Sequence, residues 1–218
     1  MKNKRMLGTT LIIVMIILMG LSIAMIASVS FPKGYKDYKN NYYFVTKQFI
    51  WFGFGTLSFW ITSKFKYTWY KKIKLYLYVI GLVLLVTVLF SKEVNGATRW
   101  FTLGGFRMQP SELAKLIIII YLAGIIDYCE RKKMNPQKLK FFLRQLIPLM
   151  IYIALIIAEK AFSSTVQIAF IGMAMIFVSG VNMGQFITAF LGAGFAGMIS
   201  IMSTPYRMKR FIGFKNPE

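Results

Sequence analysis

Long apolar runs separated by short basic loops constrain the fold of this chain more than any other feature of its sequence. A membrane-spanning helix needs about 20 mostly apolar residues, and runs close to that length recur along the whole chain. Hydrophobic residues make up 57% of the 218 residues and charged residues 16%, whereas a soluble domain is about 45–50% apolar and roughly 25% charged. One water-soluble domain cannot bury this excess, so the sequence predicts an integral membrane protein.

The runs predict an all-α fold, a polytopic bundle with about seven transmembrane helices. The expected helices cover residues 7–31, 44–63, 73–90, 113–126, 141–158, 165–181 and 185–203. The first run is too long for a signal peptide and ends at Phe31-Pro32, which indicates an uncleaved helix. Because the linkers are short, consecutive helices are expected to be antiparallel neighbours in a single membrane-embedded domain, residues 1–218.

The charged residues narrow the chemistry. The chain has 27 Lys and Arg residues against 7 Asp and Glu residues, a net charge of +20, and no histidine, which excludes histidine-based catalysis and histidine metal sites. A lone cysteine, Cys129, excludes intrachain disulfides and cysteine-cluster zinc sites. The positive charge favours anionic partners such as lipid headgroups and pyrophosphates, whereas nucleic acid is disfavoured because the basic residues lie between apolar runs. No metal site or cofactor is identified, and a requirement for a divalent cation stays open.

The distribution of Lys and Arg between alternate loops predicts a cytoplasmic N-terminus by a small margin. The outer segments are nevertheless rich in basic residues, which indicates that something anionic is handled there. The loop before the fourth run carries one of these, Arg99, beside Trp100. A guanidinium is a planar donor fork suited to phosphate, and a tryptophan anchors at the membrane interface.

The motif Gln109-Pro110-Ser111-Glu112 leads into the fourth run. Pro110 suits the first turn of a helix, and Glu112 in that turn faces the positive end of the helix dipole. Lys115 lies one turn after Glu112 on the same face, which predicts an ion pair where the membrane begins. Ionisable residues at a membrane edge point to function, so this motif is the main candidate site.

Two later segments add candidates. Glu159 ends the fifth run, and its roles as a structural ion pair or a substrate-facing carboxylate are both open; a pair with Lys160 would lower its pKa. Ser164, with Gln167 three residues on, fits a helix capping box. In the basic, aromatic tail, Arg207 and Arg210 suit either lipid headgroups or a substrate.

These motifs resemble the signature of the SEDS family, which comprises FtsW, RodA and SpoVE. The resemblance is carried by Gly96-Ala97-x-Arg99-Trp100, a Gly pair and Gln109-Pro110-Ser111-Glu112-x-x-Lys115, and continues through Glu159-x-x-Phe162-Ser163-Ser164-Thr165 and Tyr206-Arg207-x-x-Arg210. It implies a peptidoglycan glycosyltransferase that polymerises lipid II at the outer face of the bacterial cytoplasmic membrane, in division, shape or sporulation, with a class B penicillin-binding protein as partner. It also implies substrate-binding roles for the motif residues.

Two departures from the family pattern affect this expectation. Family members have about ten helices, and the Asp proposed as their general base lies in an outer loop after the seventh. No residue here corresponds to that Asp, so the catalytic residue is unknown and the chain is expected to be an inactive N-terminal portion. Ala161 stands where many members have an acidic residue. Two other classes stay open, a transporter of lipid-linked cell-wall precursors and a non-catalytic scaffold for a penicillin-binding protein.

Overall fold

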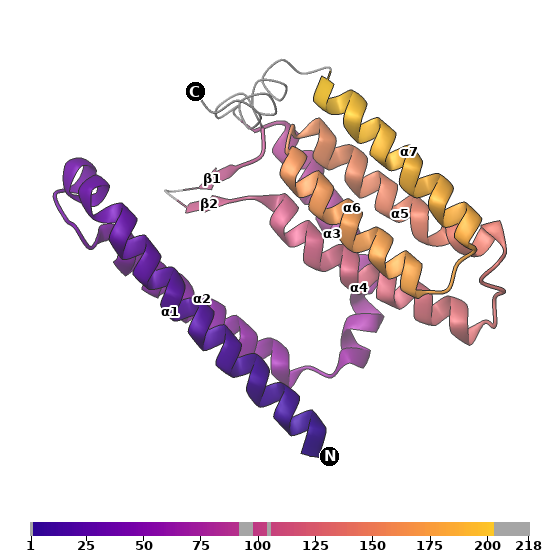
Figure 1. The fold of residues 1–218 in the computed structure, drawn as a ribbon, viewed down its shortest axis with the longest axis horizontal. Helices are drawn as coiled ribbons and strands as arrows, with labels where there is room; N and C mark the ends of the chain where they lie inside the picture. The colour runs from indigo at the N-terminus through magenta and orange to yellow at the C-terminus, as the bar shows by residue number, and fades with distance from the viewer. Residues whose placement is uncertain (1, 92–97, 104–105, 203–218) are drawn as a thin grey trace. The chain divides into compact units, whose positions relative to one another are not determined.

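The structure is a computed structural model that describes residues 2–91, 98–103 and 106–202. Seven helices and a two-stranded hairpin make up this part of the chain (Figure 1). In order they are α1 (Lys2–Tyr38), α2 (Tyr43–Lys64), α3 (Tyr67–Leu89), β1 (Phe101–Leu103), β2 (Phe106–Met108), α4 (Pro110–Arg131), α5 (Leu139–Ala158), α6 (Phe162–Val178) and α7 (Met183–Met202). The predicted all-α fold is confirmed, and the hairpin adds to it.

Apolar length explains why these segments are helical, because a helix satisfies every backbone hydrogen bond within itself. Among the described residues, three helical segments are long and apolar enough to cross a membrane: Met6–Tyr38, Tyr67–Leu89 and Leu139–Ala158. Two shorter apolar helices, Phe162–Val178 and Met183–Phe195, accompany them. The prediction of a membrane protein is therefore confirmed, whereas membrane spans for the remaining helices stay a prediction.

Helices α1 and α2 form the first of two compact units, residues Met1–Lys66. The prediction that the first helix ends at Phe31-Pro32 is wrong, because α1 continues through Pro32 to Tyr38. A proline inside a helix removes one backbone hydrogen bond but does not force the chain to stop. The chain turns just beyond, where buried Gly34 leaves room that a Cβ would close, since that atom would lie 2.7 Å from the Asn40 carbonyl oxygen. None of the residues of α2 is buried.

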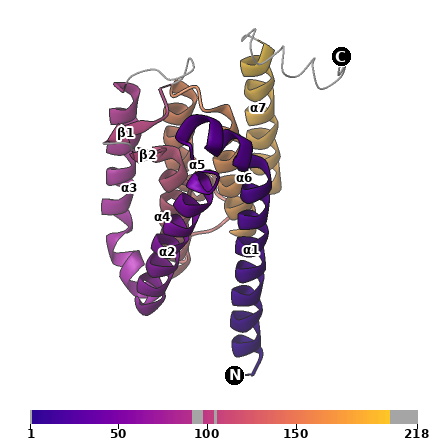
Figure 2. The same ribbon diagram turned by 90° about the vertical axis from the view of Figure 1, so that its left-hand side faces the viewer.

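Helices α3 to α7 form the second unit, residues Tyr67–Glu218. In it α4 packs against α3, α5 and α6, and Figures 1 and 2 show these helices side by side. Its core includes aliphatic side chains that are fully buried, namely Leu85, Ile118, Leu122, Leu149, Ile156, Ile168 and Ile176. Within this core the Tyr152 hydroxyl donates to the Tyr78 carbonyl at 2.8 Å. The prediction of antiparallel neighbours joined by short links holds for α4, α5 and α6. That both units form one membrane domain stays a prediction.

A small antiparallel hairpin precedes α4 and was not predicted. Phe101 pairs with Met108, and Thr102 pairs with Arg107. The sequence signal for it is the dipeptide Gly104-Gly105 between the two strands, because Gly-Gly is typical of two-residue hairpin turns. The hairpin is the part of the chain that leads directly into the candidate site at the start of α4.

Candidate functional site

The first turn of α4 holds the central motif as the sequence predicts. Pro110 occupies the start of the helix, where its missing N–H costs no hydrogen bond, and Glu112 is the acidic residue of that turn. Gln109 precedes the helix in an extended conformation, and its carbonyl accepts a hydrogen bond from the Glu112 N–H at 3.0 Å. The helix therefore begins at Pro110, three residues before the apolar run that starts at Leu113.

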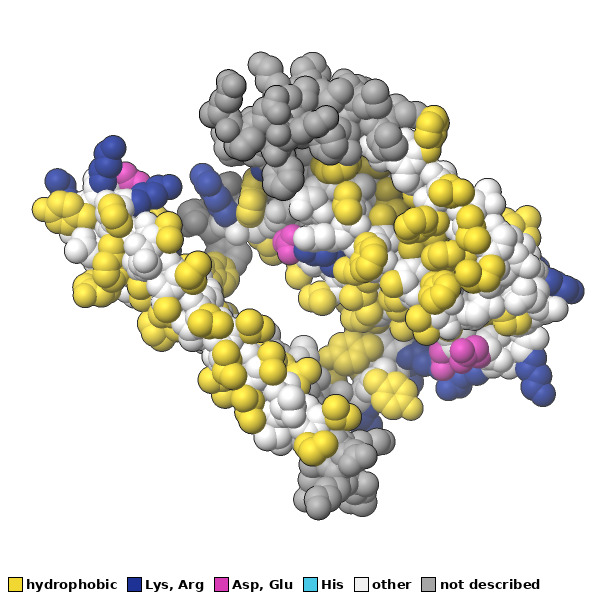
Figure 3. All heavy atoms as spheres, viewed as in Figure 1, with side chains coloured by type: hydrophobic (Ala, Val, Ile, Leu, Met, Phe, Trp, Pro, Cys, Tyr) yellow, Lys and Arg dark blue, Asp and Glu magenta, His cyan; other side chains and the backbone are white. Residues whose placement is uncertain are grey.

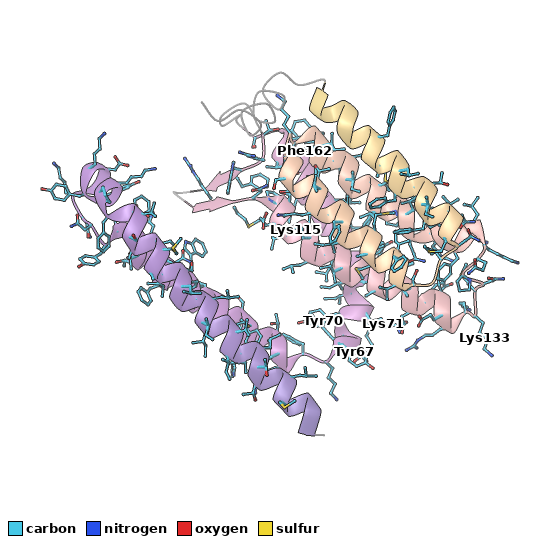
Figure 4. The ribbon with its side chains drawn as sticks, in the orientation of Figure 1. Tyr67, Tyr70, Lys71, Lys115, Lys133 and Phe162 are labelled. Carbon is cyan, nitrogen blue, oxygen red and sulfur yellow. The ribbon has the colours of Figure 1, made fainter. Side chains whose placement is uncertain are left out.

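The predicted ion pair on α4 is present. Lys115 Nζ lies 2.8 Å from Glu112 Oε2, and the same ammonium donates to Gln167 Oε1 on α6 at 2.8 Å. The Lys115 side chain is 19% exposed and that of Glu112 is 57% exposed. The positive charge is thus held between two helices and still reached from outside, and Figure 4 shows Lys115 near the start of α4.

A second polar contact joins the same two helices. Gln109 Nε2 donates to Ser111 Oγ at 2.7 Å and to Ser164 Oγ at 3.1 Å. Ser111 is fully buried and Ser164 is 5% exposed. Buried polar groups are stabilising only when they are paired, so these bonds fix the register of the α4 start against α6.

The capping box predicted from Ser164 and Gln167 is wrong. Helix α6 begins at Phe162, Ala161 is its N-cap residue, and no side chain caps it. Ser164 therefore lies inside the first turn and bonds Gln109, while Gln167 bonds Lys115. Gln167 is a site residue that sequence reasoning missed, although its spacing from Ser164 already placed both on one face of a helix.

Glu159 is the most unusual group at this end of the unit. It follows α5 directly, its side chain is fully buried, and neither carboxylate oxygen has a hydrogen-bond partner among the described residues. Burial disfavours the charged form and raises the pKa of Glu159 from 4.5 to about 8. Loss of hydration is the cause of this shift in pKa, and the lowering that a pair with Lys160 would bring is not among its causes.

The remaining predicted residues stand apart from this cluster. Arg99 and Trp100 are partly buried immediately before β1, and Arg99 Nε is buried without a hydrogen-bond partner in the described part of the chain. Arg207 and Arg210 lie outside the described residues. The structure thus brings together Gln109, Ser111 and Ser164 in one set of contacts, and Glu112 and Lys115 in another.

This arrangement suits an anionic ligand. An ammonium at Lys115 is oriented by a carboxylate and an amide, and a guanidinium nitrogen at Arg99 has unused donor capacity. Among the described residues, no group of three or more His, Cys, Asp or Glu side chains is placed to hold a metal ion. The Lys115 ammonium and the Arg99 guanidinium are the described donors of this region that suit a negatively charged group.

Comparisons with known proteins point in the same direction. A family model described as "Cell cycle protein", which covers FtsW, RodA and SpoVE, matches residues 9–218. The chain is 34% identical over 206 residues to a protein of Pseudoalteromonas translucida named probable peptidoglycan glycosyltransferase FtsW, covering 93% of this chain and 51% of that protein. A protein of the same name from Methylomonas methanica is 34% identical over 212 residues, covering 95% and 54%. The chain therefore spans about half the length of the curated relatives it matches.

Solved structures show the same fold. The crystal structure of the rod shape determining protein RodA of Thermus thermophilus superposes with a TM-score of 0.63 at 20% identity, covering 85% of this chain and 59% of that one. A chain of a peptidoglycan synthase complex superposes with a TM-score of 0.66 at 21% identity, covering 91% and 58%. At this identity the likeness concerns the fold alone.

Proposed function

The chain belongs to the FtsW/RodA/SpoVE family of cell cycle proteins, and on this premise we propose that it forms part of a peptidoglycan glycosyltransferase that polymerises lipid II. The family and the three candidate spans identify a bacterial membrane protein. The curated relatives named probable peptidoglycan glycosyltransferase support the activity. The observation that carries the proposal for this chain is the Lys115 ammonium, held by Glu112 and Gln167 at the start of α4.

Lipid II presents a pyrophosphate, and its transfer reaction develops negative charge on that leaving group. A fixed ammonium stabilises such charge without reorganising during the reaction, and in many enzymes this kind of stabilisation contributes most of the rate acceleration. In the proposed role Lys115 approaches the pyrophosphate, and Glu112 and Gln167 hold its side chain in place. No described residue is assigned as the general base. Glu159 is largely protonated at neutral pH because burial raises its pKa to about 8.

The orientation and the partner are parts of the same proposal. A cytoplasmic N-terminus places the start of α4 at the outer face, where lipid II is polymerised. The proposed partner is a class B penicillin-binding protein. A related fold in a peptidoglycan synthase complex that coordinates polymerization and crosslinking supports a partner of that kind.

A transporter of lipid-linked precursors is the alternative that the sequence left open. Transport needs a polar path through the middle of the bundle. On α4 the charged residues lie in its first turns, at Glu112 and Lys115, and in its last turns, from Asp127 onwards. This distribution and the names of the relatives favour the glycosyltransferase.

The proposal is tested by lipid II polymerisation with the protein as its source encodes it, purified with its partner. Lys115→Ala is expected to lower the rate about 10²–10³-fold, the usual cost of removing one such electrostatic donor. Lys140→Ala is the matched control, because it removes the same charge from an exposed position at the opposite end of the unit. Full activity of a folded Lys115→Ala protein would contradict the assigned role. If the unaltered protein instead moves lipid II across vesicles without polymerising it, the transporter is correct.

A further inference from the structure

The end of the second unit opposite Lys115 contains a hollow that the proposed function does not use. It has a volume of about 420 Å³ and is formed by α3, α4 and α5. We call it the basic groove and define it by Lys74, Leu75, Tyr128, Leu143, Arg144 and Ile147, which are among its lining residues. Figure 4 shows Lys71 and Lys133 toward this end, and Lys115 and Phe162 toward the other.

The two cations of the groove form no ion pair with a carboxylate in the described part of the chain. Lys74 Nζ donates to the backbone carbonyl of Gly124 on α4. Arg144 lies over the Tyr128 ring with its guanidinium carbon 4.8 Å from the ring centroid, and it donates to Met134 Sδ at 3.7 Å. Neither contact is with a carboxylate, and the one described carboxylate whose charge acts on Lys74 is Asp127.

The carboxylate of Asp127, near the C-terminal end of α4, already has two cationic partners. Asp127 forms ion pairs with Lys71 on α3 and with Arg131 on its own helix, the latter at 3.2 Å. Lys71 and Arg131 thus balance the single charge of Asp127, and the charges of Lys74 and Arg144 come in addition to theirs.

The wall beside the cations is apolar and open. Leu75 is 56% exposed, Leu143 is 37% exposed and Ile147 is 53% exposed, and all three lie on helices long and apolar enough to span a membrane. In the space-filling view, charged side chains of this unit gather toward its ends and hydrophobic side chains cover the face between them (Figure 3). A ligand that fits such a site has an anionic head and an apolar tail.

We propose that the basic groove binds an anionic phospholipid, with its phosphate between Lys74 and Arg144 and its acyl chain along Leu75, Leu143 and Ile147. Basic pockets between transmembrane helices are a recurrent way of binding acidic headgroups, and the adjoining aromatic ring suits the interface. The guanidinium supplies a planar fork to the phosphate oxygens, and the ammonium supplies a point charge. The site stands independently of the glycosyltransferase proposal, because it uses neither Lys115 nor its neighbours.

Gly124 determines how Lys74 reaches the groove. A Cβ at this position would lie 3.1 Å from Lys74 Nζ and 3.3 Å from Cε, and closer still to Cδ. Gly124→Ala would therefore displace a flexible side chain rather than the backbone. This substitution moves the ammonium while keeping every charge, which makes it a sharper probe than deletion of the lysine.

The experiment is native mass spectrometry of the chain in a neutral detergent, titrated separately with dioleoylphosphatidylglycerol and dioleoylphosphatidylcholine. We expect the unaltered chain to retain the anionic lipid in preference to the zwitterionic one. Lys74→Ala and Arg144→Ala are each expected to weaken phosphatidylglycerol binding about fivefold. Gly124→Ala is expected to weaken it in the same direction while the chain stays folded.

The matched control is the double variant Lys132→Ala with Lys140→Ala, which removes two exposed positive charges from the same end without touching the groove. It is expected to bind the lipid as the unaltered chain does. Equal weakening by the control would mean a diffuse surface charge and would overturn the proposal. Displacement of the lipid by inorganic phosphate at equal concentration would also overturn it, because the apolar wall would then contribute nothing.

Discussion

The charged side chains at the two ends of the second unit have different kinds of partner. At the start of α4, Lys115 is paired with Glu112 and Gln167, and Glu159 is buried without a hydrogen-bond partner among the described residues. At the other end, Lys74 and Arg144 flank an open groove and form no ion pair with a described carboxylate. The first end positions polar groups by contacts between helices, whereas the second offers positive charge beside an apolar wall.

This difference shows what each end can discriminate. Fixed hydrogen bonds select a ligand by the position of its polar atoms, because an unpaired buried group is costly. Unpaired cations beside lipid-facing side chains select by charge and amphipathicity, and tolerate variation in the headgroup. The two proposals therefore assign a selective polar site and a more permissive anionic one to the same bundle.

The largest effect is expected from Glu159, the buried carboxyl group of the first end, on the pH dependence of the stability. The pKa of Glu159 is raised to about 8 in the fold from 4.5, so the folded protein binds a proton that the unfolded chain releases between these values. Stability is therefore greatest below pH 4.5 as far as this group is concerned and decreases as the pH rises to about 8. The limiting slope is about 1.4 kcal/mol per pH unit.

Thermal unfolding of the purified protein at about pH 5 and about pH 8, the two sides of this window, measures the slope. Glu159→Gln keeps the shape and removes the charge, so its melting temperature is expected to depend less on pH and to exceed that of the unaltered protein at the higher pH. The control is Glu112→Gln, which changes an exposed carboxylate of the same end. If Glu159→Gln leaves the pH dependence unchanged, the carboxyl is not buried as the structure shows.

A smaller effect is expected from the packing that holds both ends in place. Gly172 of α6 faces Leu149 of α5, and an added Cβ would lie 2.9 Å from Leu149 Cγ and closer to its methyl groups. Gly172→Ala therefore overpacks the core, at a cost of about 1–3 kcal/mol. Gly192→Ala is the control, because nothing lies within 4 Å of its added Cβ.

The melting temperature and the ligand affinities of both ends should be measured together in these two variants. Because one interior supports both ends, Gly172→Ala is expected to lower the melting temperature. It is also expected to lower the ligand affinities of the two ends by similar factors. A loss of ligand affinity at one end alone would show that the two ends are positioned separately, and that they do not depend on one shared interior.

The sequence predicted those features that depend on neighbouring residues. Apolar length predicted the helices, and the spacing of Glu112 and Lys115 predicted their ion pair, because residues three apart share a helix face. Pro110 predicted the start of α4 for the same local reason. The error at Pro32 is of another kind, since proline weakens a helix without necessarily ending it.

The contacts between helices could not be predicted. Gln109 meets Ser164 and Lys115 meets Gln167 only because α4 and α6 pack in one register, which a single sequence does not contain. The capping box predicted from Ser164 and Gln167 failed for the same reason, and no side chain caps α6. Burial of Glu159 depends on the same packing, so its raised pKa was missed as well.

The smallest effect is expected at Ser164. Removal of its hydroxyl oxygen tests the hydrogen bond that joins the start of α4 to α6. Ser164→Ala removes the oxygen that accepts from Gln109 Nε2 at 3.1 Å, while the bond from Gln109 to Ser111 at 2.7 Å remains. One intramolecular hydrogen bond contributes about 1 kcal/mol, so a small decrease in melting temperature is expected. Ser163→Ala is the control, because Ser163 is exposed one position earlier.

A double-mutant cycle with Gln109→Ala separates this bond from other effects of the two substitutions. Contacting residues show a coupling energy, whereas independent residues are additive within about 0.3–0.5 kcal/mol. Coupling between Gln109 and Ser164 is expected, and its absence would mean that α4 and α6 do not share the register described. In that case Lys115 would not be held by Gln167 either, and the first end would become as permissive as the second.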